Sequence, residues 1–67
     1  MVSITLNGKP RQIDRALNVP ALLSTLDVNP KQVAVAINGD VVTRDSWPRT
    51  VVREGDVVEI VRAVGGG

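Results

Sequence analysis

The chain has 67 residues, and its last three are glycines, Gly65, Gly66 and Gly67, directly after an apolar run with the composition of a β-strand. A glycine run buries no side chain and loses much backbone freedom on ordering, so a compact domain gains nothing from it. Such an end does present a slim α-carboxylate that can enter a narrow site on another protein. We therefore predict that the Gly67 carboxylate is the functional group.

An α-carboxylate is ionised at neutral pH, and it resists nucleophiles until it becomes a better acyl donor. Adenylation by ATP makes this change, and the resulting acyl-adenylate is open to attack by sulfide or a persulfide. A side chain at Gly66 or Gly67 would hinder both passage into the activating site and attack at the carbonyl. The alternative is that the glycines are a frayed end or a remnant of cloning, because chain termini are often poorly ordered.

The side chains offer little for catalysis or metal binding. The sequence has no cysteine and no histidine, so disulfides, the usual base at neutral pH and the commonest metal ligand are all missing. Four acidic residues fall in predicted turns, where carboxylates usually bond to nearby backbone amides: Asp40, Asp45, Glu54 and Asp56. We expect no catalytic residue and no metal site, and therefore a protein that is not itself an enzyme.

The charges nearly cancel, because eight basic and seven acidic residues give a formal net charge of +1. Nucleic-acid-binding proteins usually show a basic face and stacking aromatic side chains, whereas this chain has one Trp and no Phe or Tyr. No stretch approaches the roughly 20 apolar residues of a membrane span, and the first residues lack the charged region of a signal peptide. We expect a cytoplasmic protein that binds neither nucleic acid nor membrane.

Residues 2–6 alternate apolar and polar side chains, which predicts a half-buried strand. Asn7-Gly8 follows, and this dipeptide is a strong hairpin signal because both residues accept positive φ. Residues 9–13 are then the returning strand, which Pro10 restricts to a sheet edge since proline donates no ladder hydrogen bond.

A short helix is predicted next, with Asn18 as its N-cap and Pro20 in its first turn. Its apolar face has the spacing i, i+3, i+4 and i+7 and consists of Val19, Leu22, Leu23 and Leu26. We expect the helix to end at Asn29-Pro30, because the residue before a proline avoids helical geometry.

The second half of the chain predicts three further strands and one short helical turn. The strands are residues 33–37, 41–42 and 57–64, with another short apolar pair at 51–52 and turns at 38–40 and 53–56. The helical turn spans 45–48, and its Trp47 is expected to close one end of the core. Hairpin, helix and further strands on one mixed sheet predict an α+β fold in the β-grasp arrangement, with four to five strands and one main helix.

The last strand has no cleanly polar face. Alternation places Val58 and Ile60 on the face that we assign to the helix. The other face carries Glu59 and three apolar residues, Val57, Val61 and Ala63. These three residues are either scattered surface hydrophobics or a docking patch beside the reactive terminus. The domain is expected to span 1–64, followed by a flexible glycine tail at 65–67.

The glycine tail joins three further motifs: Asn38-Gly39 after the strand 33–37, the stretch from Val42-Thr43-Arg44 to Trp47, and Glu54-Gly55-Asp56 before Val58-Glu59-Ile60. With these motifs the whole chain resembles the ThiS family, sulfur carriers of thiamine biosynthesis among the ubiquitin-like ThiS/MoaD proteins. Thr43 departs from the proline of many relatives, but it lies in a turn and puts no functional residue in doubt.

The resemblance implies that a ThiF-like adenylyltransferase, using ATP and magnesium that it binds itself, adenylates Gly67. Sulfur from a cysteine desulfurase would then give a C-terminal thiocarboxylate, which donates sulfur to a ThiG-like thiazole synthase. Gly65 and Gly66 would provide reach, and Val57, Val61 and Ala63 would dock partners. No cofactor is expected to stay bound.

Other products and other classes of protein stay open at this stage. The same carrier chemistry serves molybdopterin synthesis, tRNA thiolation and cysteine synthesis, since the partners choose the product. A protein modifier would join Gly67 to a lysine through an isopeptide bond, and a plain interaction module would not use the terminus at all.

Overall fold

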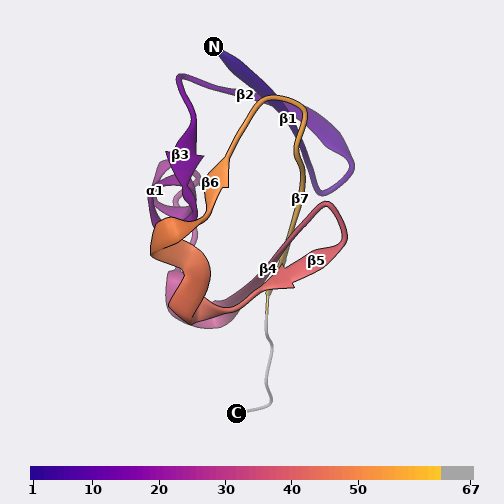
Figure 1. Cartoon of the computed structure of the whole chain (residues 1–67). Helices are drawn as coiled ribbons and strands as arrows, with labels where there is room; N and C mark the ends of the chain where they lie inside the picture. The colour runs from indigo at the N-terminus through magenta and orange to yellow at the C-terminus, as the bar shows by residue number, and fades with distance from the viewer. Residues whose placement is uncertain (63–67) are drawn as a thin grey trace.

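A computed structural model describes residues 1–62, so Ala63, Val64 and the three glycines lie outside the described residues. One face of a five-stranded sheet, with strand order β2-β1-β7-β4-β5, is covered by the helix α1 (Figure 1). The elements are β1 (Val2–Leu6), β2 (Lys9–Ile13), β3 (Leu17–Asn18), α1 (Val19–Thr25), η1 (Pro30–Gln32), β4 (Val33–Ile37), β5 (Asp40–Val42), η2 (Arg44–Arg49), β6 (Val51–Val52) and β7 (Val57–Arg62).

Both predicted hairpins are present, and the turn residues explain them. Asn7 and Gly8 have φ of 50° and 83°, and Asn38 and Gly39 have 53° and 87°, which are the positive values that a tight hairpin turn requires. β2 lies at a sheet edge, as Pro10 predicts. β7 pairs in parallel with β1 and antiparallel with β4, so the sheet is mixed and has five strands.

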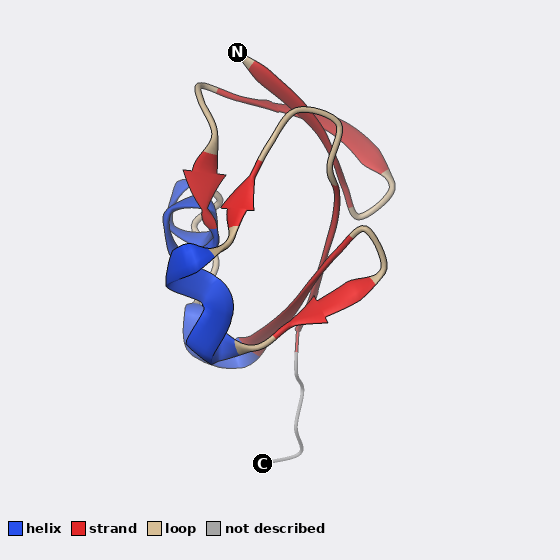
Figure 2. Cartoon of the chain, viewed as in Figure 1, coloured by secondary structure: helices blue, strands red, loops and turns tan. Residues whose placement is uncertain are grey.

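The core lies between the inner face of the sheet, which is the face toward α1, and the helical layer (Figure 2). Its buried side chains are Ile4, Ile13, Val19, Leu22, Leu23, Val33, Val35, Trp47, Val52 and Val58. Trp47 is buried as predicted, and its indole Nε1–H donates to the Val42 carbonyl at 2.9 Å. Arg44 covers the indole, with its Cζ 4.7 Å from the ring centroid.

The helix begins as predicted but ends earlier. The Asn18 side chain accepts from the Ala21 amide at 2.9 Å. α1 stops at Thr25 instead of Asn29-Pro30, because Asp27 adopts φ of 58°. The Val28 amide then bonds to the Leu23 carbonyl at 3.0 Å, and the Asp27 amide bonds to the Ser24 carbonyl at 3.1 Å. This pair of hydrogen bonds is a Schellman motif, which usually requires glycine where this chain has Asp27.

A second, two-stranded sheet was not predicted. β3 pairs antiparallel with β6, in the register Leu17–Val52 and Asn18–Val51. The sequence analysis gives 51–52 only as an apolar pair and predicts neither strand of this sheet, since two residues are too few to show a period. The pairing places β6 against the helical layer, where the side chain of Val52 is fully buried.

Strand β7 is hydrogen-bonded on both sides, and on the β1 side a side chain extends the ladder. Backbone pairing of β1 with β7 ends at Leu6 opposite Val58. The Asn7 amide still donates to the Val58 carbonyl at 2.9 Å. The Asn7 carboxamide then accepts from the Ile60 N–H at 2.8 Å and donates to the Ile60 carbonyl at 3.2 Å. The carboxamide therefore takes the place of the backbone N–H and carbonyl that a further residue of β1 would offer to β7. The main chain itself has already entered the hairpin turn at this point.

The second turn asparagine holds the start of β7 in a similar way. The Asn38 carboxamide accepts from the Val57 N–H at 2.9 Å and donates to the Asp56 carboxylate at 3.1 Å. The Asn38 backbone amide donates to the Val57 carbonyl at 2.7 Å. Each Asn-Gly dipeptide thus closes its own hairpin and also fixes one edge of β7.

Asn7→Gly tests the ladder extension, since glycine keeps the positive φ of the turn and removes only the carboxamide. We expect a loss of about 1–2 kcal/mol in the free energy of unfolding, because two hydrogen bonds are lost at about 0.5–1.5 kcal/mol each. Amide hydrogen exchange at Ile60 should accelerate selectively. Urea unfolding and exchange measured by NMR check both expectations.

Asn29→Gly is the matched control, because the Asn29 side chain accepts from the Lys31 amide in η1 and does not contact β7. It should leave exchange at Ile60 unchanged relative to the global stability. Equal exchange at Ile60 in the two variants would show that the Asn7 carboxamide does not hold β7.

Candidate functional site

The predicted functional group follows the central strand of the sheet. β7 has two neighbours on each side in the strand order, and its last residue is Arg62. Gly65, Gly66 and Gly67, the residues predicted to react and to give reach, lie outside the described residues. The described part of the site is therefore β7 itself and the surfaces on either side of it.

The two faces of β7 are assigned correctly by the sequence pattern. Val58 is fully buried on the inner face and Ile60 is half-buried beside it. Val57 and Val61 are 44% and 62% exposed on the outer face, which is the side away from α1. Ala63, the third predicted docking residue, lies outside the described residues. Exposure of Val57 and Val61 is what a docking surface requires, and the docking itself stays a prediction.

The sequence analysis missed three neighbours that enlarge this surface. In the sheet register Ala34 lies opposite Val61, and Ala36 lies opposite both Glu59 and Val41. Val41 is 76% exposed. The two alanines have short side chains, so the outer face projects little at their positions. We call these residues the outer patch: Val57, Val61, Ala34, Ala36 and Val41. The alternation of alanine with valine in 33–37 was the available signal, since it places the small residues on one face.

Two of the four turn carboxylates accept hydrogen bonds from backbone amides, and the one at Asp56 is local, as the sequence analysis expects. Glu54 accepts from the Ser3 amide at 2.9 Å, and Asp56 accepts from the Arg53 amide at 2.9 Å. Within residues 1–62 no polar or charged side chain is buried. The same part of the chain contains no group of three or more acidic residues placed to hold a metal ion.

None of the described helices is both long and apolar enough to span a membrane.

Comparison with known proteins identifies one family and a solved structure that match nearly all of this chain. The sequence model of the ThiS family matches residues 4–67. The crystal structure of the thiamine biosynthesis protein ThiS from Geobacter metallireducens superposes with a TM-score of 0.88 at 42% sequence identity, covering 98% of this chain and 100% of that one. The fold is therefore the β-grasp, as predicted.

Two relatives differ in how much of their length the chain matches. The sulfur carrier protein ThiS of Escherichia coli is 30% identical over 66 residues, which is 98% of this chain and 100% of that protein. The thiazole synthase of Paramagnetospirillum magneticum is 36% identical over 66 residues, and the chain spans only 20% of its length. The family match extends over nearly all of the sequence, and the chain belongs to the ThiS family.

Proposed function

We propose that this protein is a sulfur carrier of thiamine biosynthesis and that the Gly67 carboxylate carries the sulfur. The observation that carries the proposal is the ThiS family match, which runs from residue 4 through the three glycines to residue 67. Relatives from E. coli and G. metallireducens that align over their whole length bear the names of a sulfur carrier and a thiamine biosynthesis protein.

The first chemical step in this proposal is adenylation. A Gly67 carboxylate oxygen attacks the α-phosphorus of ATP, pyrophosphate leaves, and an acyl-adenylate forms. The partner adenylyltransferase binds the ATP and its magnesium ion, which offsets the negative charge of the phosphates. The carrier supplies only the acyl group, so it is a substrate in this step and not the enzyme.

The second step replaces the adenylate with sulfur. The terminal sulfur of a persulfide, formed by a cysteine desulfurase, attacks the Gly67 carbonyl carbon, and AMP leaves. A thiol then reduces the resulting acyl disulfide, which releases a C-terminal thiocarboxylate. A chain without cysteine fits this scheme, because the terminus and not a side chain holds the sulfur.

Glycine at 65, 66 and 67 serves both steps. An activating site that closes around the terminus to exclude water has to admit the backbone alone, and a Cβ next to the carbonyl would crowd the attacking sulfur. Strand β7 does not take part in the chemistry. Its hydrogen bonds to β1 and β4 fix the position of the strand that precedes the reactive segment.

The outer patch supports docking of the partners. Exposed apolar side chains that gather on a small domain commonly mark a protein interface, and this patch includes Val57 and Val61, which lie on the outer face of β7 on either side of the exposed Glu59. We propose that the adenylyltransferase and the thiazole synthase both bind here. The thiazole synthase of P. magneticum contains a segment similar to this chain, which supports thiazole synthase as the acceptor of the sulfur.

Gly67→Ala should slow adenylation about 100-fold, because misplacement of a reacting group by about 1 Å has an effect of this size. A chain extended by one residue after Gly67 should be equally impaired. The measurement is ATP–pyrophosphate exchange with the adenylyltransferase from the same genome. Thermal unfolding should be unchanged in both variants, and normal exchange by the extended chain would contradict the proposal.

Val61→Asp should lower kcat/KM for adenylation about tenfold or more, because it places a charge on the described outer-patch residue that is nearest to the glycines in the sequence. The free energy of unfolding should change by less than about 1 kcal/mol, since the side chain is exposed on a strand. The same exchange assay and urea unfolding separate the two effects.

Val51→Asp is the matched control, because Val51 is 40% exposed on β6 and lies outside the outer patch. Its exchange activity should match the wild-type value. If both aspartate variants reduce adenylation equally, the outer patch is not the docking surface.

A further inference from the structure

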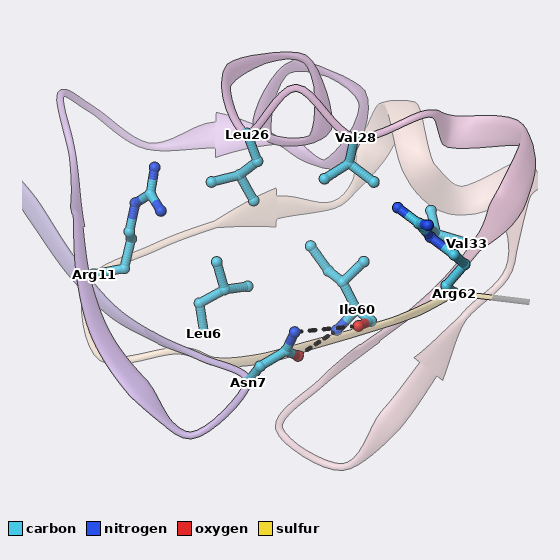
Figure 3. A pocket seen from close by; sticks show the side chains of 8 residues that line it. All are labelled: Leu6, Asn7, Arg11, Leu26, Val28, Val33, Ile60 and Arg62. Atoms are coloured by element: carbon cyan, nitrogen blue, oxygen red, sulfur yellow. Dashed lines mark hydrogen bonds between the residues drawn. The ribbon is translucent and has the colours of Figure 1, made fainter.

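A groove of about 270 Å³ lies on the inner side of the sheet, at the end where β7 leaves it (Figure 3). The outer patch is on the opposite face of the same strand, so the two surfaces are distinct. The groove is lined by Leu6, Asn7, Arg11, Leu26, Val28, Val33, Ile60 and Arg62.

The groove exists because α1 covers only part of the sheet. The helix has seven residues, and its Schellman ending turns the chain away at Asp27. Leu26 and Val28 therefore face Leu6 and Ile60 across an open space (Figure 3). All four of these aliphatic side chains are only half-buried, so the groove still exposes apolar surface that a ligand could cover.

Arginines stand at the two ends of this apolar space (Figure 3). Arg11 comes from β2, where its register position opposite buried Ile4 places it on the inner face. Arg62 is the last described residue of β7, and both arginines are exposed. Lys9 adds a third positive charge on the same face, opposite Leu6. None of the described residues that line the groove is acidic.

One residue at the edge of the sheet, Arg62, adjoins the groove without a strand partner on the β1 side. The Val58 carbonyl and both backbone groups of Ile60 bond toward β1 and Asn7. Because strand residues alternate in direction, the N–H and carbonyl of Arg62 lie on the same edge. β1 has already turned away at Asn7, and among residues 1–62 no strand pairs with Arg62 on this side. This edge can accept a strand from another chain.

We propose that the groove and this edge together bind an extended segment of a partner protein, in which an aliphatic residue is flanked by acidic residues. The segment pairs its backbone with Arg62, inserts the aliphatic side chain between Ile60 and Val28, and places its carboxylates near Arg11 and Arg62. Unpaired backbone groups favour a peptide, and the positive rim requires an acidic one. The inference rests on the proposed function, since the partner is the protein that holds the glycine terminus.

Arg11→Glu tests the proposal, because Arg11 is exposed, far from the terminus in the sequence, and outside β7. Binding is measured with the purified adenylyltransferase and thiazole synthase from the same genome. We expect about tenfold weaker binding to at least one of them, with a smaller dependence on salt concentration. Arg49→Glu is the matched control, since Arg49 is also exposed, lies in η2 and does not line the groove.

Methyl NMR on the carrier provides the second readout. In the wild-type complex the methyl resonances of Leu26 and Val28 should shift, because the partner's aliphatic side chain covers them. Unshifted groove methyls with both partners overturn the proposal whatever Arg11→Glu does, and so does an Arg11→Glu affinity equal to that of Arg49→Glu.

The same wild-type samples are assayed for sulfur uptake, which separates the two hypotheses. A wild-type carrier that takes up no sulfur contradicts the proposed function. Normal uptake without involvement of the groove contradicts only the inference about the acidic segment.

Discussion

The roles that we assign to the surfaces of this protein depend on the hydrogen bonds that hold β7 along both of its edges. Antiparallel pairing with β4 fixes one edge from Ile37 to Val33, and parallel pairing with β1 fixes only the first part of the other. The Asn7 carboxamide extends the second edge as far as Ile60. β7 is therefore hydrogen-bonded on both edges up to Ile60 and on the β4 edge up to Arg62, its last described residue. A carrier needs such a firmly held strand, because a partner must recognise a folded surface and still receive a narrow chain end.

The faces of β7 have different chemistry and, in our account, different roles. The outer patch is made of apolar side chains around the exposed Glu59, and apolar exposed surface of this kind suits the docking of partners. The groove on the inner face is apolar with a positive rim, and it adjoins the unpaired edge at Arg62. A partner that used both surfaces would hold β7 from two sides and restrict the direction in which the glycine segment leaves. Fixing this direction would matter for adenylation, since the reaction depends on the placement of a single carboxylate.

Local signals in the sequence predict much of this fold. The two Asn-Gly turns, the Asn18 cap, the apolar helix face and the core position of Trp47 each depend on residues that are close in the chain. What could not be predicted depends on distant partners or on an unusual residue. The Asn7 carboxamide bonds to a strand 53 residues away, and the helix ends at Asp27 where the motif usually has glycine. Of the outer patch, only Val57 and Val61 on β7 were predicted, because Val41 and the two alanines join it only through the sheet register.

The central claim is that the terminus of this chain accepts sulfur, and the most direct test is the intact mass of the protein after reaction. The wild-type chain is incubated with ATP, magnesium, cysteine, a cysteine desulfurase, a thiol reductant and the adenylyltransferase from the same genome. Our account predicts that one oxygen atom is replaced by one sulfur atom and that fragmentation localises the change to Gly67. An unchanged mass with an adenylyltransferase that is active on its own carrier would contradict the account. A covalent conjugate through a lysine would contradict it as well, and would identify a protein modifier.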